Sequence, residues 1–484
     1  MKKFFVILPV CVASVLASCT ANDSNDDSFT SGPDRMIAEL TGEEAISLMA
    51  DKTYTLSDDE VLQIVETFAS QDVPSTETYS TRANTLRIVD NYALDNIDGV
   101  PTRFDNTGAA TVFSVVSLGL GDNGDSGIAV VCRDSRYPEV LAYAPNADTQ
   151  MLKENGPMQL MMTRAHWIAL KYIEKCNEIT AELRETTLKR VCQTLGISTD
   201  KFDFSNKIGS TYIKGGYDIK VQTVPEGTLL TAVGPLCGNT RLIQGWPCNQ
   251  FIPETTLKKY DTEVHHGHFP AGCVNVALAT ICSYLRPTIY SSDLGRNINW
   301  DYVYDSYFNP YSFNAAQYDP DTPQAKEVGY LLKILANGTK TTFNENGGST
   351  TTSNAASYMK SIGVDMSSST SKLIYTNVRP SLANKYLVFC MGKYSEQTRS
   401  DSGELNTNHT WVIDGLQIRK PLTRMELQNY NCYANCKFGW IEWDNFSMYD
   451  GWYLFDTDGT ITFKFDGSEQ IAANLSCIPN IKLK

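Results

Sequence analysis

The stretch of sequence that decides the fold is FPAGCVNVALATICSYLRP, residues 269–287. Pro270 and Gly272 permit a sharp change of chain direction just before Cys273. Apolar residues then recur at helical spacing as far as Pro287, so we predict a buried helix that begins at or beside Cys273. Because the peptide dipoles at a helix N-terminus favour a thiolate, we expect a lowered pKa at Cys273 and predict that it is a nucleophile.

The base that a thiol nucleophile needs must be one of five histidines. His409 opens HTWVIDGL, a strand-like run whose apolar residues would anchor it in a sheet while the imidazole stays exposed at the edge. It lies 136 residues after Cys273. Cys282 falls in the middle of the predicted helix, so we expect it to be inert. We therefore predict that Cys273 and His409 form the nucleophile and base.

The other histidines carry weaker signals. His166 lies on an apparent helix and is expected to be a packing or surface residue. His265, His266 and His268 crowd one polar loop, where adjacent residues of an extended segment point in opposite directions. We favour a solvated loop over a metal site there, and expect neither a metal ion nor an organic cofactor.

Acyl transfer also needs a hydrogen-bond donor aimed at the oxyanion of the tetrahedral intermediate. Gln244 lies in LIQGWPCNQFIP, a loop with Gly and Pro that precedes the nucleophile. We predict that its side-chain amide supplies this donor.

Several motifs occur in the order found in the streptopain family of bacterial cysteine peptidases, which is papain-like. QGWPCN at 244–249 resembles the family's Gln-x-x-Pro-Tyr-Asn, and Gly272-Cys273 is followed by an alanine-containing helix that ends in Tyr-x-x-Pro. HTWVIDG at 409–415 is similar to His-Ala-Trp-Val-Ile-Asp-Gly, and FGW at 438–440 partly keeps Trp-Gly-Trp. Gly234-Pro235-Leu236 resembles the start of the mature enzyme. The distance from Cys273 to His409 also fits the separation of ~130–150 residues in papain-like enzymes.

The resemblance implies an α+β fold, with a papain-like catalytic domain preceded by an α+β pro-domain that acts as an intramolecular inhibitor. It implies a zymogen that cleaves protein or peptide substrates without a cofactor. Cys273 would attack the carbonyl, His409 would take and return the proton, and Gln244 with the Cys273 N–H would hold the oxyanion. Trp440 would shield one side of the histidine.

Two residues depart from the family pattern. Cys248 replaces the usual Tyr, and Lys437 stands where the family has the Asn that orients the catalytic histidine. Lysine cannot accept a hydrogen bond, so we predict that Lys437 points elsewhere and that Asn435, two residues away on the same strand face, partly substitutes. A degraded binding or scaffold protein on the same fold remains an alternative. A transglutaminase- or amidase-like acyl transferase is a weaker one.

The N-terminus predicts export. Residues 1–18 have two lysines followed by a short apolar run, which is typical of a signal peptide, and they lead into Leu-Ala-Ser-Cys19. This ending resembles a bacterial lipobox, and the polar, acidic tether at 19–34 resembles the surface-export signals of Bacteroidetes lipoproteins. We predict lipidation at Cys19 and a lipoprotein of the cell surface or outer membrane, with membrane contact through the lipid anchor.

Length and composition fit this organisation. The 484 residues suggest two or three domains, which we predict as a pro-domain at 35–222 and a catalytic domain at 228–484. A net charge of −14 argues against a nucleic-acid partner. The remaining patterns predict helices at 36–50, 58–70, 326–338 and 353–363, one long or two broken helices from 158 to about 195, a polar break at 196–222, and strands at 111–120, 127–145, 385–392, 409–418, 451–459 and 460–466.

Overall fold

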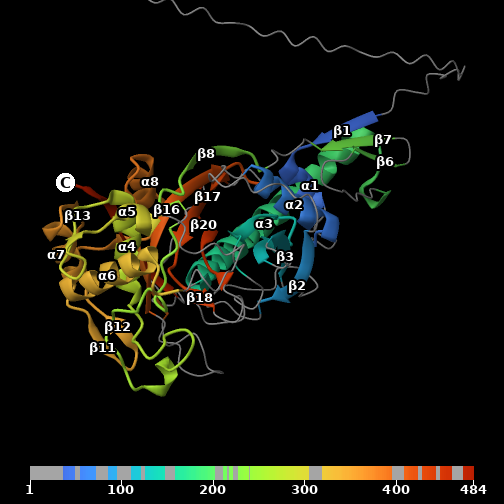
Figure 1. The fold of residues 1–484 in the computed structure, drawn as a ribbon. Helices are drawn as coiled ribbons and strands as arrows, with labels where there is room; N and C mark the ends of the chain where they lie inside the picture. The colour runs from blue at the N-terminus through green and yellow to red at the C-terminus, as the bar shows by residue number, and fades with distance from the viewer. Residues whose placement is uncertain are drawn as a thin grey trace, which may run out of the picture.

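The structure is a computed structural model in which α-helices and β-strands are both present in each half of the described residues (Figure 1). The residues that it describes are 36–48, 55–71, 86–94, 111–120, 126–145, 147, 158–201, 211–214, 217–221, 227–238, 240–304, 319–394, 408–422, 428–442, 447–459 and 473–484. The predicted signal peptide, Cys19, the tether and the predicted strand at 460–466 lie outside these residues.

The N-terminal part of the chain, residues 36–221, begins with a strand and two helices and ends with a strand pair. Its elements are β1 (Met36–Leu40), α1 (Gly42–Leu48), α2 (Asp58–Ser70), β2 (Arg87–Ala93), β3 (Val112–Leu120), β4 (Ser126–Cys132), β5 (Val140–Ala144), α3 (Met158–Leu195), η2 (Thr199–Lys201), β6 (Thr211–Lys214) and β7 (Tyr217–Val221).

Most local predictions in this part are confirmed. Helix α2 begins with a capping box between Ser57 and Glu60, which satisfies backbone N–H groups of its first turn. Helix α3 is one continuous helix of 38 residues. The strand at 111–120 also forms, whereas the stretch 127–145 contains two strands, β4 and β5, with residues 133–139 between them.

The helix predicted for 36–50 is wrong in its first third. Residues 36–40 form β1, which pairs in parallel with β7. Leu40 is fully buried with Val191 and Leu195 of α3, so a partner distant in sequence overrides the local helical spacing. Strands β6 and β7 lie within residues 196–222, the stretch predicted to be a polar break.

The C-terminal part, residues 227–484, carries helices first and long strands last. Its elements are β8 (Leu229–Val233), η3 (Lys258–Tyr260), α4 (Cys273–Leu285), β9 (Tyr290–Ser291), β10 (Arg296–Asn297), α5 (Trp300–Tyr304), α6 (Pro323–Gly338), β11 (Thr342–Asn344), β12 (Gly347–Ser349), α7 (Thr352–Ser361), β13 (Val364–Asp365), β14 (Ser371–Lys372), α8 (Tyr375–Ala383), β15 (Leu387–Tyr394), β16 (Asn408–Arg419), β17 (Gln428–Lys437), β18 (Ile441–Glu442), β19 (Ser447–Met448), β20 (Gly451–Gly459) and β21 (Ala473–Leu483). This order confirms the α+β fold class.

One sheet joins the two parts of the chain. Its main path runs β13-β21-β15-β16-β17-β20-β5-β4-β3-β2, so strands of the N-terminal part extend the sheet of the C-terminal part. The junction is the antiparallel pair β20 and β5, in which Trp452 lies opposite Tyr143 and Tyr453 opposite Ala142. The two parts therefore share a hydrogen-bonded sheet.

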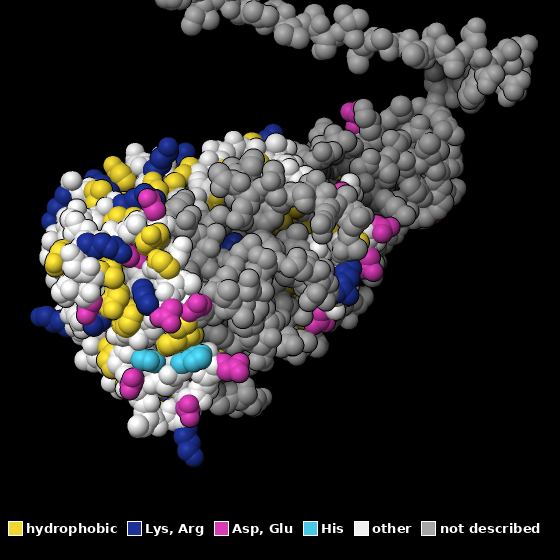
Figure 2. Space-filling model, viewed as in Figure 1, with side chains coloured by type: hydrophobic (Ala, Val, Ile, Leu, Met, Phe, Trp, Pro, Cys, Tyr) yellow, Lys and Arg dark blue, Asp and Glu magenta, His cyan; other side chains and the backbone are white. Residues whose placement is uncertain are grey.

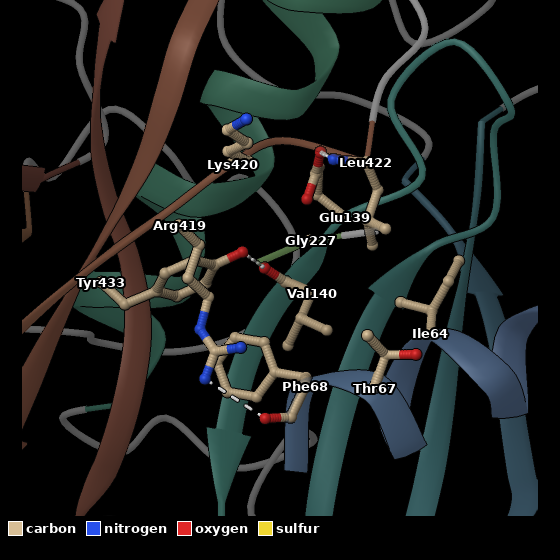
Figure 3. A pocket seen from close by; sticks show the side chains of 10 residues that line it. All are labelled: Ile64, Thr67, Phe68, Glu139, Val140, Gly227, Arg419, Lys420, Leu422 and Tyr433. Carbon is tan, nitrogen blue, oxygen red and sulfur yellow. Dashed lines mark hydrogen bonds between the residues drawn. The ribbon is translucent and has the colours of Figure 1, made fainter. Parts of the chain in front are cut away.

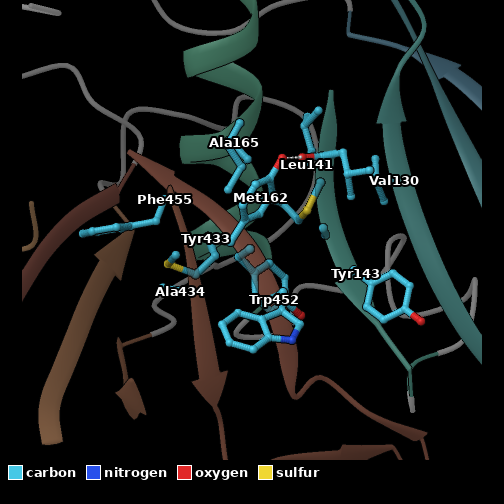
Figure 4. Packing of buried hydrophobic residues seen from close by; sticks show 14 of the residues in the cluster. Val130, Leu141, Tyr143, Met162, Ala165, Tyr433, Ala434, Trp452 and Phe455 are labelled. Carbon is cyan, nitrogen blue, oxygen red and sulfur yellow. Dashed lines mark hydrogen bonds between the residues drawn. The ribbon is translucent and has the colours of Figure 1, made fainter. Parts of the chain in front are cut away.

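They also share a hydrophobic core. Helix α3 packs against β20 and β5, and side chains of both parts are buried together in one cluster. Figure 4 shows Met162 and Ala165 of α3 and Leu141 of β5 beside Tyr433, Ala434 and Phe455 of the C-terminal strands. A second core lies between α4, α6 and α7 and includes Val412 of β16. Strand β16 thus has a different core on each face.

A small pocket marks a further contact between the two parts (Figure 3). The Arg419 guanidinium at the end of β16 lies over the Phe68 ring of α2, 3.8 Å from its centroid, and donates to the Phe68 carbonyl at 3.2 Å. The Leu422 N–H donates to the Glu139 carboxylate. Polar contacts thus fix α2 and the chain before β5 to the C-terminal part.

No described helix is long and apolar enough to cross a bilayer.

Candidate active site

Helix α4 begins at Cys273, as the sequence predicts. Gly272 precedes it with φ of 90° and ψ of 134°, a conformation that favours glycine. A Cβ on Gly272 would lie 2.6 Å from the Gly348 carbonyl oxygen, so the close approach of β12 also requires glycine. The sharp turn before the helix therefore positions the thiol.

Exposure distinguishes Cys273 from the other cysteines. The described residues include eleven, no two of which are joined by a disulfide, and only Cys273 is not buried. Burial raises the pKa of Cys282 and Cys248, so these thiols are poor nucleophiles.

The Gln244 loop is tied to the chain just before Cys273. The Ala271 N–H donates to the Gln244 carbonyl at 2.9 Å, and the Asn249 side-chain amide donates to the Phe269 carbonyl at 3.2 Å. Gln244 itself is partly exposed. The structure therefore places the Gln244 backbone beside Ala271, two residues before Cys273.

His409 does not lie at an exposed edge, which corrects the prediction for it. Its side chain is 2% exposed, and Nε2 lies 2.8 Å from the Phe438 carbonyl oxygen. A carbonyl only accepts, so Nε2 carries the proton in this arrangement. The ring is also parallel to that of Trp411, which lies two residues further along β16.

Strand alternation explains the direction of the imidazole. Side chains two residues apart share a face of a strand, so His409 lies on the face of Trp411 and the next residue, Thr410, on that of Val412. Val412 packs in the core that contains α4, whereas Trp411 packs in the core that contains α3. His409 thus points away from the helix that carries Cys273.

Thr410 occupies the position beside the thiol. Desolvation of the half-buried thiol raises the pKa of Cys273, and hydrogen bonds with the Thr410 side chain and backbone partly oppose that rise. Burial also lowers the pKa of His409 to about 4. The lowered thiol pKa that the helix N-terminus predicts is therefore not found, and nothing in this arrangement favours a thiolate-imidazolium pair.

The N-terminal part covers the face on which His409 lies. Gly392 of β15 is paired directly with His409, and a Cβ on Gly392 would lie 2.9 Å from the Leu160 side chain of α3. Because directly paired residues present their side chains to the same face, α3 begins over the face that receives the imidazole.

Trp440 lies against His409, with ring centroids 5.6 Å apart in an edge-to-face arrangement. Lys437 points elsewhere, since its Nζ donates to the Gly238 carbonyl at 3.1 Å and lies 3.6 Å from Asp450. Asn435 is buried on β17, and among the described residues no hydrogen bond joins it to His409.

Three residues at the site escaped sequence reasoning. They are Thr410 beside the thiol, Phe438 with its carbonyl on the imidazole, and Asp450, which accepts a hydrogen bond from the Phe438 N–H at 2.8 Å. A backbone carbonyl leaves no mark in a sequence, and Thr410 is visible only as the neighbour of His409.

Among the remaining histidines, His166 has a structural role. His166 is buried on α3, with its Nε2 2.7 Å from the Tyr92 hydroxyl, as expected for a packing residue. His265, His266 and His268 lie on the loop before Cys273. Within the described residues, no group of three His, Cys, Asp or Glu side chains is arranged to hold a metal ion.

A thiol at the start of a helix, a glutamine loop tied to the chain before it, and a histidine packed against Trp440, which follows the neighbouring strand β17, are groups that a cysteine peptidase would use. The sequence model of the Peptidase C10 family matches residues 244–453, so this part of the chain is similar to that family. This confirms the family resemblance.

Two solved structures from Prevotella intermedia are similar to the chain. A prointerpain A fragment is 14% identical, with 83% of this chain and 99% of that one covered and a TM-score of 0.41. The active interpain A cysteine protease is also 14% identical, with 52% and 96% covered and a TM-score of 0.31. No curated protein matches the chain.

Proposed function

We propose that this chain is the latent precursor of a cysteine endopeptidase, with Cys273 as nucleophile and His409 as its base after activation. The observation that carries the proposal is the partly exposed thiol at the start of α4, with the Gln244 loop tied beside it. His409 directly precedes Thr410 on β16, and Thr410 is the residue that lies beside this thiol.

The chemistry follows from these positions. After His409 removes the thiol proton, the Cys273 sulfur attacks the peptide carbonyl, and the Cys273 N–H with the Gln244 amide stabilises the oxyanion. His409 returns the proton to the leaving amine as the C–N bond breaks. A water molecule then hydrolyses the thioester and regenerates the thiol.

Latency in this proposal has a specific structural cause. The imidazole donates to the Phe438 carbonyl on the wrong face of β16, and α3 packs over that face. Activation requires the start of β16 to turn so that the positions of His409 and Thr410 relative to Cys273 are exchanged. Removing the N-terminal part uncovers that face, which supports its role as an intramolecular inhibitor.

The second candidate is a surface binding or scaffold protein with degraded catalysis. One observation favours it: His409 is buried, with its Nε2 on a carbonyl and its pKa lowered to about 4. In this candidate, the chain never reaches an arrangement in which the imidazole contacts the thiol.

The test compares wild type with Cys273→Ala and, as a matched control, Cys192→Ala, which removes a buried thiol far from α4. We expect wild type and Cys192→Ala to process themselves, cleave casein under reducing conditions and gain the mass of a thiol-directed peptidyl inhibitor. Cys273→Ala should do none of these. Equal cleavage by all three would exclude Cys273 as the nucleophile, and no cleavage by any would favour the scaffold candidate.

Export and lipidation are a separate part of the proposal. The apolar run at 4–16, the Leu-Ala-Ser-Cys19 ending and the acidic tether support a lipoprotein at the cell surface or outer membrane. Cys19→Ser should release the protein from the membrane fraction. Membrane partitioning equal to that of wild type would contradict the lipid anchor.

A further inference from the structure

Three aromatic rings lie together on the loop that connects Gln244 to Cys273. The rings of Trp246 and His266 are stacked, with centroids 4.5 Å apart and an angle of 26° between planes. The His268 ring lies on the same indole at 5.8 Å and 34°. We call these three rings the loop platform.

The loop platform is held by backbone contacts from both sides. The Trp246 N–H donates to the Val264 carbonyl at 2.8 Å, and the Nδ1 of His268 lies 2.7 Å from the Ile252 carbonyl oxygen. A β-bridge pairs Glu254 with His268. The position of the rings is thus set by the fold of the loop.

Their exposure is not explained by core packing. His266 is exposed, while Trp246 and His268 are partly exposed. Figure 2 shows histidine side chains at the surface of this face of the molecule. His266 has φ of 47°, which is uncommon for a residue with a side chain. The loop holds a strained residue so that its ring covers an indole at the surface.

The loop platform adjoins the proposed reaction site. Trp246 follows Gln244 by two residues, and the Gln244 carbonyl is bonded to the Ala271 N–H, two residues before Cys273. The rings thus lie on the same loop as the residues that would hold a peptide for attack by Cys273.

We propose that Trp246, His266 and His268 form a specificity subsite that binds an aromatic side chain of the substrate within three residues of the cut bond. This proposal rests on the proposed peptidase function. Ring pairs at such separations contribute beyond the burial of their area, which corresponds to a preference of roughly two- to tenfold for a ring over an aliphatic side chain.

The test uses the activated protein and peptides that carry Phe or Leu at each of the three positions on either side of the cut bond. We expect kcat/KM to favour Phe over Leu by roughly two- to tenfold at one of these positions. His266→Asn, which tolerates the left-handed backbone but lacks a ring, and Trp246→Leu should bring that ratio close to one. Glu263→Ala, an exposed change on the same loop, is the matched control and should keep the ratio.

A binding measurement separates this proposal from the proposed function. The same peptides are titrated into the full chain carrying Cys273→Ala, with and without His266→Asn, by calorimetry. Suppose that wild type cleaves no peptide, yet Phe peptides bind and His266→Asn weakens their binding. The subsite proposal is then supported, and the proposed peptidase function is contradicted. The subsite proposal is overturned if the Phe-to-Leu ratio of kcat/KM is one in wild type, or if both variants keep the wild-type ratio. If nothing is cleaved, equal binding of Phe and Leu peptides overturns it.

Discussion

His409 and Thr410 are neighbours in the chain, yet they lie on opposite faces of β16. Because side chains alternate along a strand, a shift of β16 by one residue decides whether the His409 imidazole or the Thr410 hydroxyl lies beside Cys273. The Phe438 carbonyl and the Trp440 ring hold the imidazole on the face away from Cys273. If the chain is a latent peptidase as proposed, the difference between its latent and active sites resides in two residues at the start of one strand.

Lys437→Asn restores the family's usual residue, yet we expect it to destabilise the protein rather than activate it. The Lys437 and Asp450 side chains are 11% and 8% exposed, and Lys437 also lowers the pKa of the buried Asp414. Removing the cation leaves buried carboxylates unpaired, which should cost about 3 kcal/mol of unfolding free energy. Urea unfolding measures this loss.

The control for Lys437→Asn is Lys175→Asn, which breaks an exposed ion pair with Glu178 and should change little. A variant Lys437→Asn that is as stable as wild type and cleaves peptides much faster would show that Lys437 occupies the orienting position after all.

Acidification should destabilise the precursor through its buried histidines. Burial lowers the pKa of His166 from 6.5 to about 3 and that of His409 to about 4. The unfolded chain therefore binds more protons, so the stability is fully present above about pH 6.5 and is lost as the pH falls toward the folded values. Each group contributes about 1.4 kcal/mol per pH unit in this window.

Asp414 opposes this effect, because burial raises its pKa to about 6 and its contribution to stability grows as the pH falls through that value. Desolvation also lowers the pKa of the half-buried His265 to about 4, which acts in the same sense as the other histidines. Urea unfolding at pH 7 and pH 5 should show a net loss. In His166→Phe the loss should be smaller by about 2 kcal/mol, and an equal loss would exclude His166 as a contributor.

At the scale of elements, the junction of β20 with β5 depends on a glycine. A Cβ on Gly451 would lie 2.5 Å from the Tyr143 carbonyl oxygen and 2.7 Å from the Ala144 Cα. Both contacts are with the backbone of β5, which cannot move aside as a side chain can. We therefore expect Gly451→Ala to separate β5 from β20 and to lower the unfolding free energy by about 1–3 kcal/mol.

Hydrogen exchange at residues 140–144 measures the separation, and the exchange should become faster in Gly451→Ala. Gly295→Ala, where no atom lies within 4 Å of the new Cβ, introduces only the backbone strain of φ 63° and should leave these amides protected. Unchanged protection in Gly451→Ala would mean that the strand pair tolerates the side chain.

At the scale of the whole molecule, the N-terminal part is built into the fold rather than laid over a cleft. It contributes strands to the shared sheet, helix α3 to the shared core, and Phe68 to the contact with Arg419. A single cut in the connecting chain removes none of these interactions.

We therefore expect the two parts to stay together after cleavage. A recognition sequence for a specific protease, inserted between Val221 and Gly227 in a Cys273→Ala background, should yield two chains that elute as one species in size-exclusion chromatography. They should separate in urea. Separate elution in buffer alone would show that the shared sheet is too weak to hold the parts, and that a cut suffices for release.

Local features of the sequence determined much of this protein. The turn before Cys273, the helix after it, the capped helix α2 and the strands at 111–120 and 127–145 are all set by residues close together in the chain, so their spacing predicts them. The motifs around Gln244, Cys273 and His409 likewise sufficed to indicate the family.

Only the tertiary structure decided how these pieces meet. Alternation along β16 predicts that His409 and Thr410 face opposite sides, but not which side receives α4, because that depends on packing between segments more than a hundred residues apart. Tertiary contacts also decided that β1 forms a strand, because it pairs with β7, and that β5 joins the sheet, because it pairs with β20. Strand pairing and burial are non-local interactions, so a short stretch of sequence leaves them open.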